Sequence, residues 1–299
     1  MNKIKMEIVK DLATAEVLWN TFTPKETIYD EWEFRYCFYK YFNYELFFYT
    51  AYEEGKPVGL LPLEYNSDQN YLEYFGGNFM EDNRVLVKPG YEYLIPDFFN
   101  APKQKMVFLD IRGNDPFIQK LEIRDHKFVL DLSKVGSVEN YLQNYFGSET
   151  RKTFRKCFKK ITDRKLNILI NNFEDIELLF EYNIRQFGDK SRFVDRPHRK
   201  EIFRDLLNLS FEPVLFTFEV DGVKEGVSLC LKYKKVYESF NTGIRNDSIK
   251  HLFAFMIMKN IDYALQNGML YYDAFGADCN WKEKWGFTKI PQYKFENNL

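Results

Sequence analysis

The order of helices and strands indicated by the sequence occurs twice, and this repeat limits the folds open to the chain. Each half shows two helical patterns, three strand patterns, one further helix and another strand. In the first half these patterns cover residues 11–22, 30–41, 46–52, 57–65, 71–75, 91–99 and 106–111, with a turn at Glu54–Gly55 and an added strand over 127–132. In the second half they cover residues 176–187, 198–207, 214–220, 226–233, 236–242, 248–267 and 270–275, and Asp221–Gly222 predicts a hairpin turn. Corresponding strands lie roughly 165 to 168 positions apart, which predicts a duplicated α+β domain.

The length and composition agree with two globular domains. A chain of 299 residues with 45% hydrophobic and 29% charged residues is long enough for two cores, and it is not disordered. We expect an N-terminal domain over residues 1–135 and a C-terminal domain over residues 136–299. A basic helix over residues 148–165 is expected at their junction.

Charge and cysteine usage exclude several classes of function. The chain has 42 Lys and Arg against 44 Asp and Glu, so binding of DNA through bulk charge is disfavoured. Charged residues interrupt the N-terminal segment, and no run of about 20 apolar residues occurs, so we expect neither a signal peptide nor a membrane span. The four cysteines and three histidines are scattered without a CxxC pair, which predicts no metal site and no disulfide framework. We therefore expect a cytoplasmic, reduced protein.

The segment over residues 151–165 is the most biased in the chain, with eight Lys and Arg and one acid. Its apolar residues recur with helical spacing, which predicts an amphipathic helix that begins near an N-cap at Ser148. This helix is either a solvated surface helix or a cationic wall beside an anionic ligand. In the second case Arg151 and Arg155 are candidates for substrate binding.

A long apolar helix is predicted over residues 248–267, where Gly268 ends it. The start of a helix presents unpaired amides and the positive end of the helix dipole, so it is a potential anion site. Arg245 and Lys250 would add positive charge there. Neither a phosphate-binding GxxxxGK[ST] loop nor a dinucleotide-binding GxGxxG motif occurs in the chain.

A second dense segment covers residues 271–287 (YYDAFGADCNWKEKWGF). Asp273 lies on a predicted buried strand, where a charge usually needs a partner. Lys282 follows the end of this strand, between Trp281 and Trp285. The tryptophans could cap the sheet, or the lysine could neutralise an anion that develops during a reaction.

Several motifs over residues 141–287 together resemble the Fem-related acyltransferases of the GNAT superfamily, which include the CelD-like enzymes of polysaccharide biosynthesis. The motifs are Tyr141-Leu-x3-Phe146 with Arg151-x3-Arg155, Gln186-Phe187-Gly188 with Ser191 and Phe193, Asn241-Thr242-Gly243, and Tyr272-Asp273-x2-Gly276 with Lys282 and Gly286. The resemblance implies two tandem GNAT domains, each a mixed, mainly antiparallel sheet flanked by helices. It also implies an N-acyltransferase that uses acetyl-CoA or another acyl-CoA, without a metal, and acylates an amine such as an amino sugar or a nucleotide-linked sugar.

The expected site combines this resemblance with the residue chemistry. Lys282 would stabilise charge on the leaving group, and Asp273 and Tyr237 would orient the amine or relay its proton. The acyl donor would bind at Gly243, Arg245, Ser248, Ile249, Lys250 and His251. This stretch lacks the glycine-rich loop that is common in acetyl-CoA-binding GNAT domains.

That departure leaves two alternatives open. The donor could be an aminoacyl-tRNA, as in the Fem transferases, although the basic segment is too short to be their inserted helical hairpin. The chain could instead be a degenerate, non-catalytic GNAT module that binds a ligand or a partner.

Overall fold

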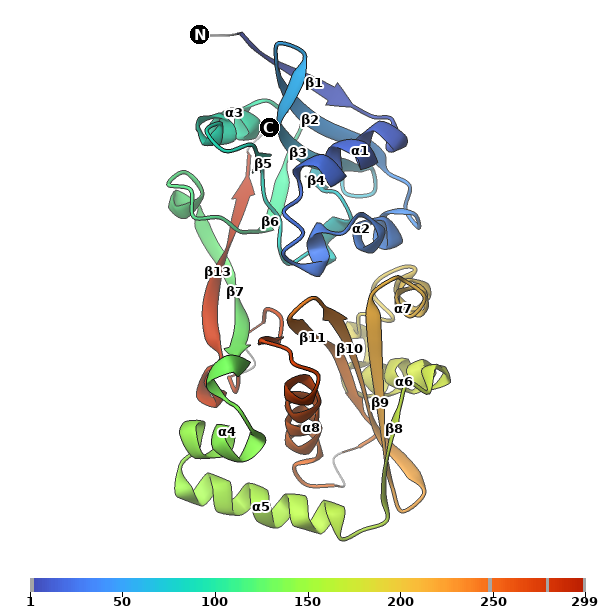
Figure 1. Ribbon diagram of the computed structural model, residues 1–299. Helices are drawn as coiled ribbons and strands as arrows, with labels where there is room; N and C mark the ends of the chain where they lie inside the picture. Colours follow the sequence, from blue (N-terminus) through green and yellow to red (C-terminus); the bar gives the residue numbers. More distant parts are fainter. Residues whose placement is uncertain (1–2, 247–248, 278–279, 298–299) are drawn as a thin grey trace. The chain divides into compact units, whose positions relative to one another are not determined.

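The computed structural model describes residues 3–246, 249–277 and 280–297 (Figure 1). The chain divides into two compact units. One unit runs through His126 and takes up the chain again from Pro291, and the other comprises Lys127–Ile290. The sequence placed the residues after Pro291 in the second domain. They join the first unit because strand β13 (Thr288–Glu296) pairs with β6 (Val107–Ile111) of that unit.

The first unit is a β-sheet with helices on both faces. Its strands follow the order β1-β2-β3-β4, β5 pairs with β3, and a short parallel bridge joins the start of β4 to the residue before β6. Helices α1 and α2 cover an aromatic core around Trp19, Trp32 and Phe75, and α3 covers the opposite face around Phe98 and Phe99. The elements are β1 (Ile4–Val9), α1 (Leu12–Phe22), α2 (Trp32–Tyr39), β2 (Glu45–Glu53), β3 (Lys56–Asn66), β4 (Tyr71–Tyr74), β5 (Leu86–Val87) and α3 (Ile95–Asn100).

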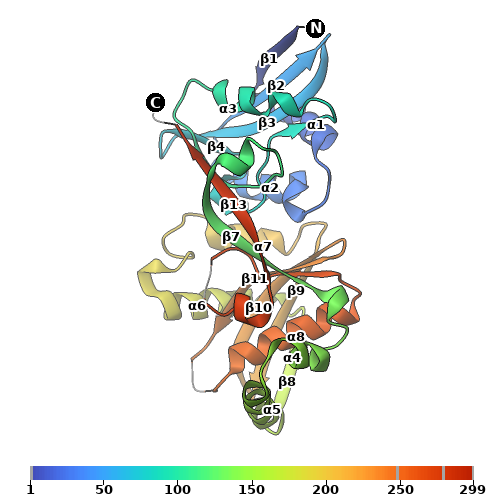
Figure 2. The same cartoon turned by 90° about the vertical axis from the view of Figure 1, so that its left-hand side faces the viewer.

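The second unit repeats this plan with a longer central helix. Its sheet has the strand order β7-β12-β11-β10-β9-β8, in which only the β11–β12 pair is parallel. Helix α8 covers one face of this sheet and α6 the other (Figures 1 and 2). The elements are β7 (Glu122–Asp131), α4 (Val138–Tyr145), α5 (Ser148–Thr162), β8 (Leu166–Ile170), α6 (Ile176–Phe187), α7 (Arg199–Leu206), β9 (Glu212–Val220), β10 (Val223–Tyr233), β11 (Val236–Ile244), α8 (Leu252–Gln266) and β12 (Tyr271–Asp273).

The two halves of the chain share one element order, as the repeat predicts. The order β1-α1-α2-β2-β3-β4-α3-β6-β7 recurs as β8-α6-α7-β9-β10-β11-α8-β12-β13. The last strand of each half is exchanged: β7 pairs with β12 in the second unit, and β13 pairs with β6 in the first. Each unit therefore completes its sheet with a strand from the other half of the sequence.

Tight turns hold the central hairpins in register. Asp221 and Gly222 join β9 to β10 with φ values of 55° and 80°, and Glu54 and Gly55 join β2 to β3 with φ values of 48° and 75°. Two successive left-handed residues match the right-handed twist of the flanking strands, which is why aspartate–glycine is favoured at such turns. The hairpin predicted at Asp221–Gly222 is confirmed.

Two helix starts differ from the sequence prediction. Helix α5 begins with Ser148 already helical, so the N-cap is Gly147 and not Ser148. Helix α8 begins at Leu252, several residues after the predicted start, because His251 adopts a left-handed conformation with a φ of 63°. Ser248 lies outside the described residues.

Candidate active site

Strands β11 and β12 of the second unit run parallel for only three residues and then part. Val236, Tyr237 and Glu238 pair with Tyr271, Tyr272 and Asp273, after which β12 ends. Strand β11 continues to Ile244 with β10 on one side and, in the part of the chain that the structure describes, no strand on the other. The sheet therefore opens after Glu238 and Asp273, and this edge of β11 pairs with no described strand beyond that point. This opening is called the fork below.

The fork carries buried charge. Lys127 of β7 forms an ion pair with Asp273, with 2.7 Å between Lys127 Nζ and Asp273 Oδ2, and both residues are at least 98% buried. Asp273 Oδ1 also accepts a hydrogen bond of 2.9 Å from the backbone N–H of Phe275. Glu238, which is fully buried, is the neighbour of Asp273 in the register. Asp273 has the partner that its burial requires, and two carboxylates and one ammonium lie where the strands part.

Lys282 turns back toward the end of β12, and its side chain is buried. Its ammonium donates hydrogen bonds to the carbonyl oxygens of Phe275 (3.0 Å) and Gly276, and it lies 5.1 Å from the centre of the Phe128 ring. Phe275 and Ala277 both have φ values of 60°, so this loop has a backbone conformation that side chains disfavour. Lys282 therefore holds the strained loop through main-chain oxygens.

Tyr237 does not join the predicted group of site residues. Successive residues of a strand face opposite sides, so Tyr237 and Tyr272 lie under α8, whereas Glu238 and Asp273 lie on the other face. Burial, together with the neighbouring Cys230, raises the pKa of Tyr237 well above its ordinary value. A phenol that holds its proton so firmly cannot serve as a base near neutral pH. Tyr237 and Asp273 therefore lie on opposite faces of the sheet, and a role in orienting the amine or relaying its proton stays a prediction for each.

The start of α8 has some of the features that are expected of an anion site. Its first turn leaves the amides of Phe253 and Ala254 without a backbone acceptor among the described residues. Lys250 is exposed, His251 is half-buried, and Ile249 is buried. Arg245 is half-exposed and lies 3.4 Å from Glu225 of β10, so its charge is shared with a carboxylate. Amides and cations are thus present without a glycine-rich loop.

Gly243 has a packing role that the sequence did not reveal. A Cβ atom at this position would lie 3.1 Å from Tyr182 Cβ and 3.2 Å from the carbonyl oxygen of Leu179. Both residues belong to α6, so the glycine allows this helix to lie close against β11. This face of the strand at Gly243 is therefore covered by α6.

The basic helix α5 lies beside the start of α8. The rings of Phe154 and His251 are 5.8 Å apart, and those of Phe158 and Phe255 are 5.4 Å apart. Arg151 donates a hydrogen bond of 2.7 Å to the carbonyl oxygen of Phe146.

The two arginines of α5 bind the neighbouring helix. Arg151 reaches the end of α4, and Arg155 pairs with Glu139 of α4. Both arginines thus contact α4, and their predicted role in substrate binding stays a prediction. Three lysines remain exposed on α5 and form no ion pair with another described residue: Lys152, Lys156 and Lys160.

Sequence reasoning missed Lys127 and Glu238. Both lie on strands that the sequence predicted, and a charged residue beside apolar ones in such a strand was the available signal. Asp273 was found in that way, but its ion-pair partner comes from the exchanged strand β7, which the sequence does not align with β12.

A membrane-spanning helix and a metal-binding cluster are both absent from the described residues. None of their helices is long and apolar enough to cross a membrane. No group of three or more histidine, cysteine, aspartate or glutamate side chains among residues 3–246, 249–277 and 280–297 is arranged to hold a metal ion.

Comparisons with known proteins agree with this architecture. A family model described as an acetyltransferase (GNAT) domain matches residues 148–283, which include the fork and α8. No curated protein matches the chain in sequence. The second unit and the duplicated element order thus define a tandem GNAT fold.

Solved structures share the fold over nearly the whole chain. L-PGS from Bacillus licheniformis is 10% identical, covers 97% of this chain and 93% of its own, and gives a TM-score of 0.61. FemX is 11% identical, with coverages of 97% and 96% and a TM-score of 0.60. A tandem GNAT protein from the clavulanic acid biosynthesis pathway is 11% identical, with coverages of 98% and 98% and a TM-score of 0.53. At these identities the likeness establishes the fold alone.

Proposed function

We propose that this protein is an N-acyltransferase that moves an acyl group, most simply acetyl, from acyl-CoA to an amine. The observation that carries the proposal is the fork between β11 and β12, which lies within the segment that matches the GNAT acetyltransferase model. The acceptor that we propose is an amino sugar or a nucleotide-linked sugar, on the strength of the resemblance to CelD-like enzymes.

The second unit has groups that fit an acyl-CoA donor. The pantetheine arm of coenzyme A contains amides, and the edge of β11 beyond Glu238, which pairs with no described strand, can bind amides as a neighbouring strand would. The amides of Phe253 and Ala254 and the exposed Lys250 suit the diphosphate. Bound acyl-CoA would supply an activated thioester.

The chemistry at the fork requires a neutral amine, an acceptor for its proton and donors for the oxyanion. We assign the backbone N–H groups of β11 to the oxyanion. Glu238 and Asp273 would orient the amine, and Lys127 and the amide of Phe275 hold Asp273 in place. Lys282 acts as a positioning residue, because its ammonium is bound to carbonyl oxygens of the loop.

One observation favours a second donor, an aminoacyl-tRNA. Lys152, Lys156 and Lys160 recur every fourth residue on the exposed side of α5, beside the start of α8. Residues four apart on a helix lie about 6 Å apart along its axis, so three phosphates of a nucleic-acid strand could contact this row. Structural likeness to FemX agrees with this reading at the level of the fold.

A direct assay separates these readings. The protein is incubated with acetyl-CoA and D-glucosamine, and free thiol release and the mass of the product are measured. Acetylated amine supports the acyl-CoA reading, and transfer from an aminoacyl-tRNA alone supports the second. If neither donor reacts and neither raises the melting temperature, the protein is a non-catalytic GNAT module, since a ligand that binds the folded state must stabilise it.

A further inference from the structure

The sheet of the first unit has an edge strand, β1, that pairs on its outer side with no other strand of the described residues. It lies at the end of the strand order β1-β2-β3-β4 (Figures 1 and 2). Its six residues pair with β2 in one continuous register, from Ile4 with Glu53 to Val9 with Phe48. A strand in this position can add a further strand through its backbone N–H and C=O groups.

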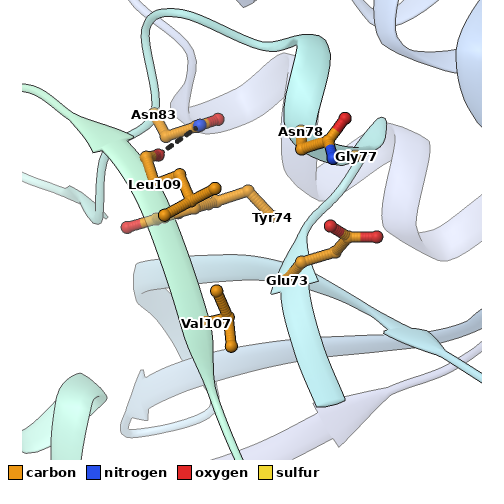
Figure 3. A pocket seen from close by; sticks show the side chains of 7 residues that line it. All are labelled: Glu73, Tyr74, Gly77, Asn78, Asn83, Val107 and Leu109. Carbon is orange, nitrogen blue, oxygen red and sulfur yellow. Dashed lines mark hydrogen bonds between the residues drawn. The ribbon is translucent and has the colours of Figure 1, made fainter. Parts of the chain in front are cut away.

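The opposite end of this strand order is covered by the protein itself. Figure 3 shows Glu73 and Tyr74 of β4 beside Val107 and Leu109 of β6. The space between these side chains holds no more than about one water molecule. Strand β6 is paired in turn with β13. Of the two ends of the order β1-β2-β3-β4, β1 is therefore the one that is open to another chain.

The side chains of β1 alternate between the two faces of the sheet. Ile4 and Met6 pack, partly buried, against the core under α3, and Ile8 on the same face is 45% exposed. On the other face the side chains of Lys5 and Glu7 form an ion pair of 2.6 Å and are 73% and 44% exposed. Strand β1 thus offers apolar surface on one face and one charge of each sign on the other.

This order of residues is complementary to itself. If β1 pairs antiparallel with β1 of a second copy so that the two Met6 residues are opposite each other, Lys5 of each copy lies opposite Glu7 of the other. Ile4 lies opposite Ile8 in the same way, so the exposed Ile8 side chain receives an apolar neighbour. Each ammonium then has a carboxylate along its own strand and another across the pair of strands, and opposite charges in such positions are stabilising.

Other registers of the same two strands match poorly. A slip by one residue places Lys5 opposite Ile8 and Met6 opposite Glu7. A slip by two residues places Lys5 opposite Lys5 or Glu7 opposite Glu7, and like charges that are directly opposite are destabilising. The pattern of β1 therefore selects the register that is centred on Met6.

The edge strand of the second unit, β8, lacks this complementarity. Its sequence LNILI contains no charged residue, and the corresponding pairing about Ile168 would place Asn167 opposite Leu169. A charge on an edge strand ordinarily opposes pairing with another chain. In β1 each charge would meet its opposite, so the same charges favour a second copy of this chain and disfavour other strands.

We propose that β1 is the contact surface between two copies of this chain, which pair antiparallel about a twofold axis at Met6 and join the sheets of their first units. Such a contact is isologous, because the same residues meet from both sides. It is formed by six residues of each copy, fewer than the roughly 20–30 a side of a standard stable interface. We therefore expect a reversible dimer whose population rises with concentration. The contact does not depend on acyl transfer.

Sedimentation velocity over a series of concentrations tests whether the dimer forms. We expect the wild type to pass from the mass of one chain to that of two, and Lys5→Glu and Glu7→Lys each to remain monomeric, because each places like charges opposite one another. Lys134→Glu is the matched control, since Lys134 is also 73% exposed and paired with an acid, Asp131, and it should dimerise as the wild type does. A wild type that stays monomeric up to about 1 mM would overturn the proposal.

A mixture of the two monomeric variants tests the charge pairing itself. Lys5→Glu carries two acids on this face of β1 and Glu7→Lys carries two lysines, so the mixture should form a heterodimer that neither variant forms with itself. The double variant Lys5→Glu/Glu7→Lys restores opposite charges and should dimerise as the wild type does. Both results are read by native mass spectrometry. If the mixture and the double variant stay monomeric, the charges do not face each other and the proposal is wrong.

Cross-linking tests the register. Met6→Cys places two thiols directly opposite each other, so mild oxidation should give a disulfide-linked dimer, whereas Ile4→Cys alone should not. The wild type, with its half-buried Cys157, gives the background. Ile168→Cys, at the centre of β8, is the control and should not exceed that background. A linked dimer from Ile168→Cys and none from Met6→Cys would place the contact at β8 and contradict the proposal.

Discussion

Lys127 and Asp273 form a buried ion pair, 2.7 Å between nitrogen and oxygen, on two strands that are neighbours only because the halves of the chain exchange their last strands. Breaking such a pair leaves one charge buried without a partner, which costs about 3–5 kcal/mol. We expect Lys127→Met and Asp273→Asn each to lower the free energy of unfolding by an amount in this range, measured by urea denaturation. Lys159→Met, at the exposed pair with Asp163, is the control and should change it by less than about 1 kcal/mol.

A double substitution gives a sharper result. Lys127→Met combined with Asp273→Leu removes both charges, so the loss should be smaller than the sum of the two single losses. Simple additivity would show that the two residues do not act as a pair.

Removal of the Lys282 ammonium should loosen the loop after β12. Hydrogen bonds from a charged donor contribute about 1.5–3 kcal/mol, and the carbonyl oxygens of Phe275 and Gly276 would lose theirs. We expect Lys282→Ala to lower the free energy of unfolding by about 2 kcal/mol. The exposed Lys284→Ala is the matched control. Unchanged stability together with lost turnover would instead make Lys282 a group that contacts the substrate.

Gly286 should tolerate no side chain. Its φ is 81°, and a Cβ atom would come within 2.0 Å of the Tyr145 ring of α4. Gly268 has a similar φ of 67° with open space around it, so Gly268→Ala carries only the conformational cost of about 1–2 kcal/mol. We expect Gly286→Ala to cost more than this control, with thermal denaturation as the measurement. Equal melting temperatures for the two variants would refute the close contact.

The start of α8 should affect the binding of the donor and not the chemical step. If acetylation of D-glucosamine is observed, Lys250→Ala and Arg245→Ala should raise the KM for acetyl-CoA severalfold with little change in kcat, because they remove binding that is equal in the ground and transition states. Lys234→Ala, exposed at the β10–β11 turn, is the control. A lower kcat at constant KM would move the donor phosphates elsewhere.

The thiol of Cys230 should resist alkylation at mildly alkaline pH. Burial raises its pKa to about 11, so the reactive thiolate is scarce at pH 8. We expect iodoacetamide to modify the half-buried Cys157 well before Cys230, as read by mass spectrometry of peptides. Early labelling of Cys230 in the folded protein would show that α8 does not shield it.

Much of the fold follows from local patterns in the sequence. The hairpins at Glu54–Gly55 and Asp221–Gly222 and the helix α6 (Ile176–Phe187) were predicted within a few residues, because turn chemistry and apolar periodicity are local. Strands β1, β8 and β13 were missed. Strand β1 alternates apolar and charged residues from Ile4 to Ile8, so its pattern was present in the sequence. Strand β8 is a short edge strand that alternates weakly, and β13 contains Pro291, which argues against a strand interior.

The site was harder to predict, because strand pairing brings its residues together and their spacing along the sequence does not show this. Asp273 was predicted because it lies on a strand that the sequence indicated to be buried. Its partner Lys127 lies on β7, and the sequence pattern does not show which strand pairs with β12. Tyr237 was placed with Asp273, although the register puts them on opposite faces. Gly243 was predicted to bind the donor, and the structure shows in addition that it lies in close contact with α6.

The exchange of β7 and β13 has a consequence for synthesis of the protein on the ribosome. The first unit lacks the strand beside β6 until residues 291–296 have emerged, by which time the second unit has received β7. A strand pairing this distant in sequence is slow to form, and the open edge of β6 is exposed to other chains meanwhile. We expect neither half to fold when expressed alone, whereas the two halves expressed together should reassemble, each lending the other its missing edge.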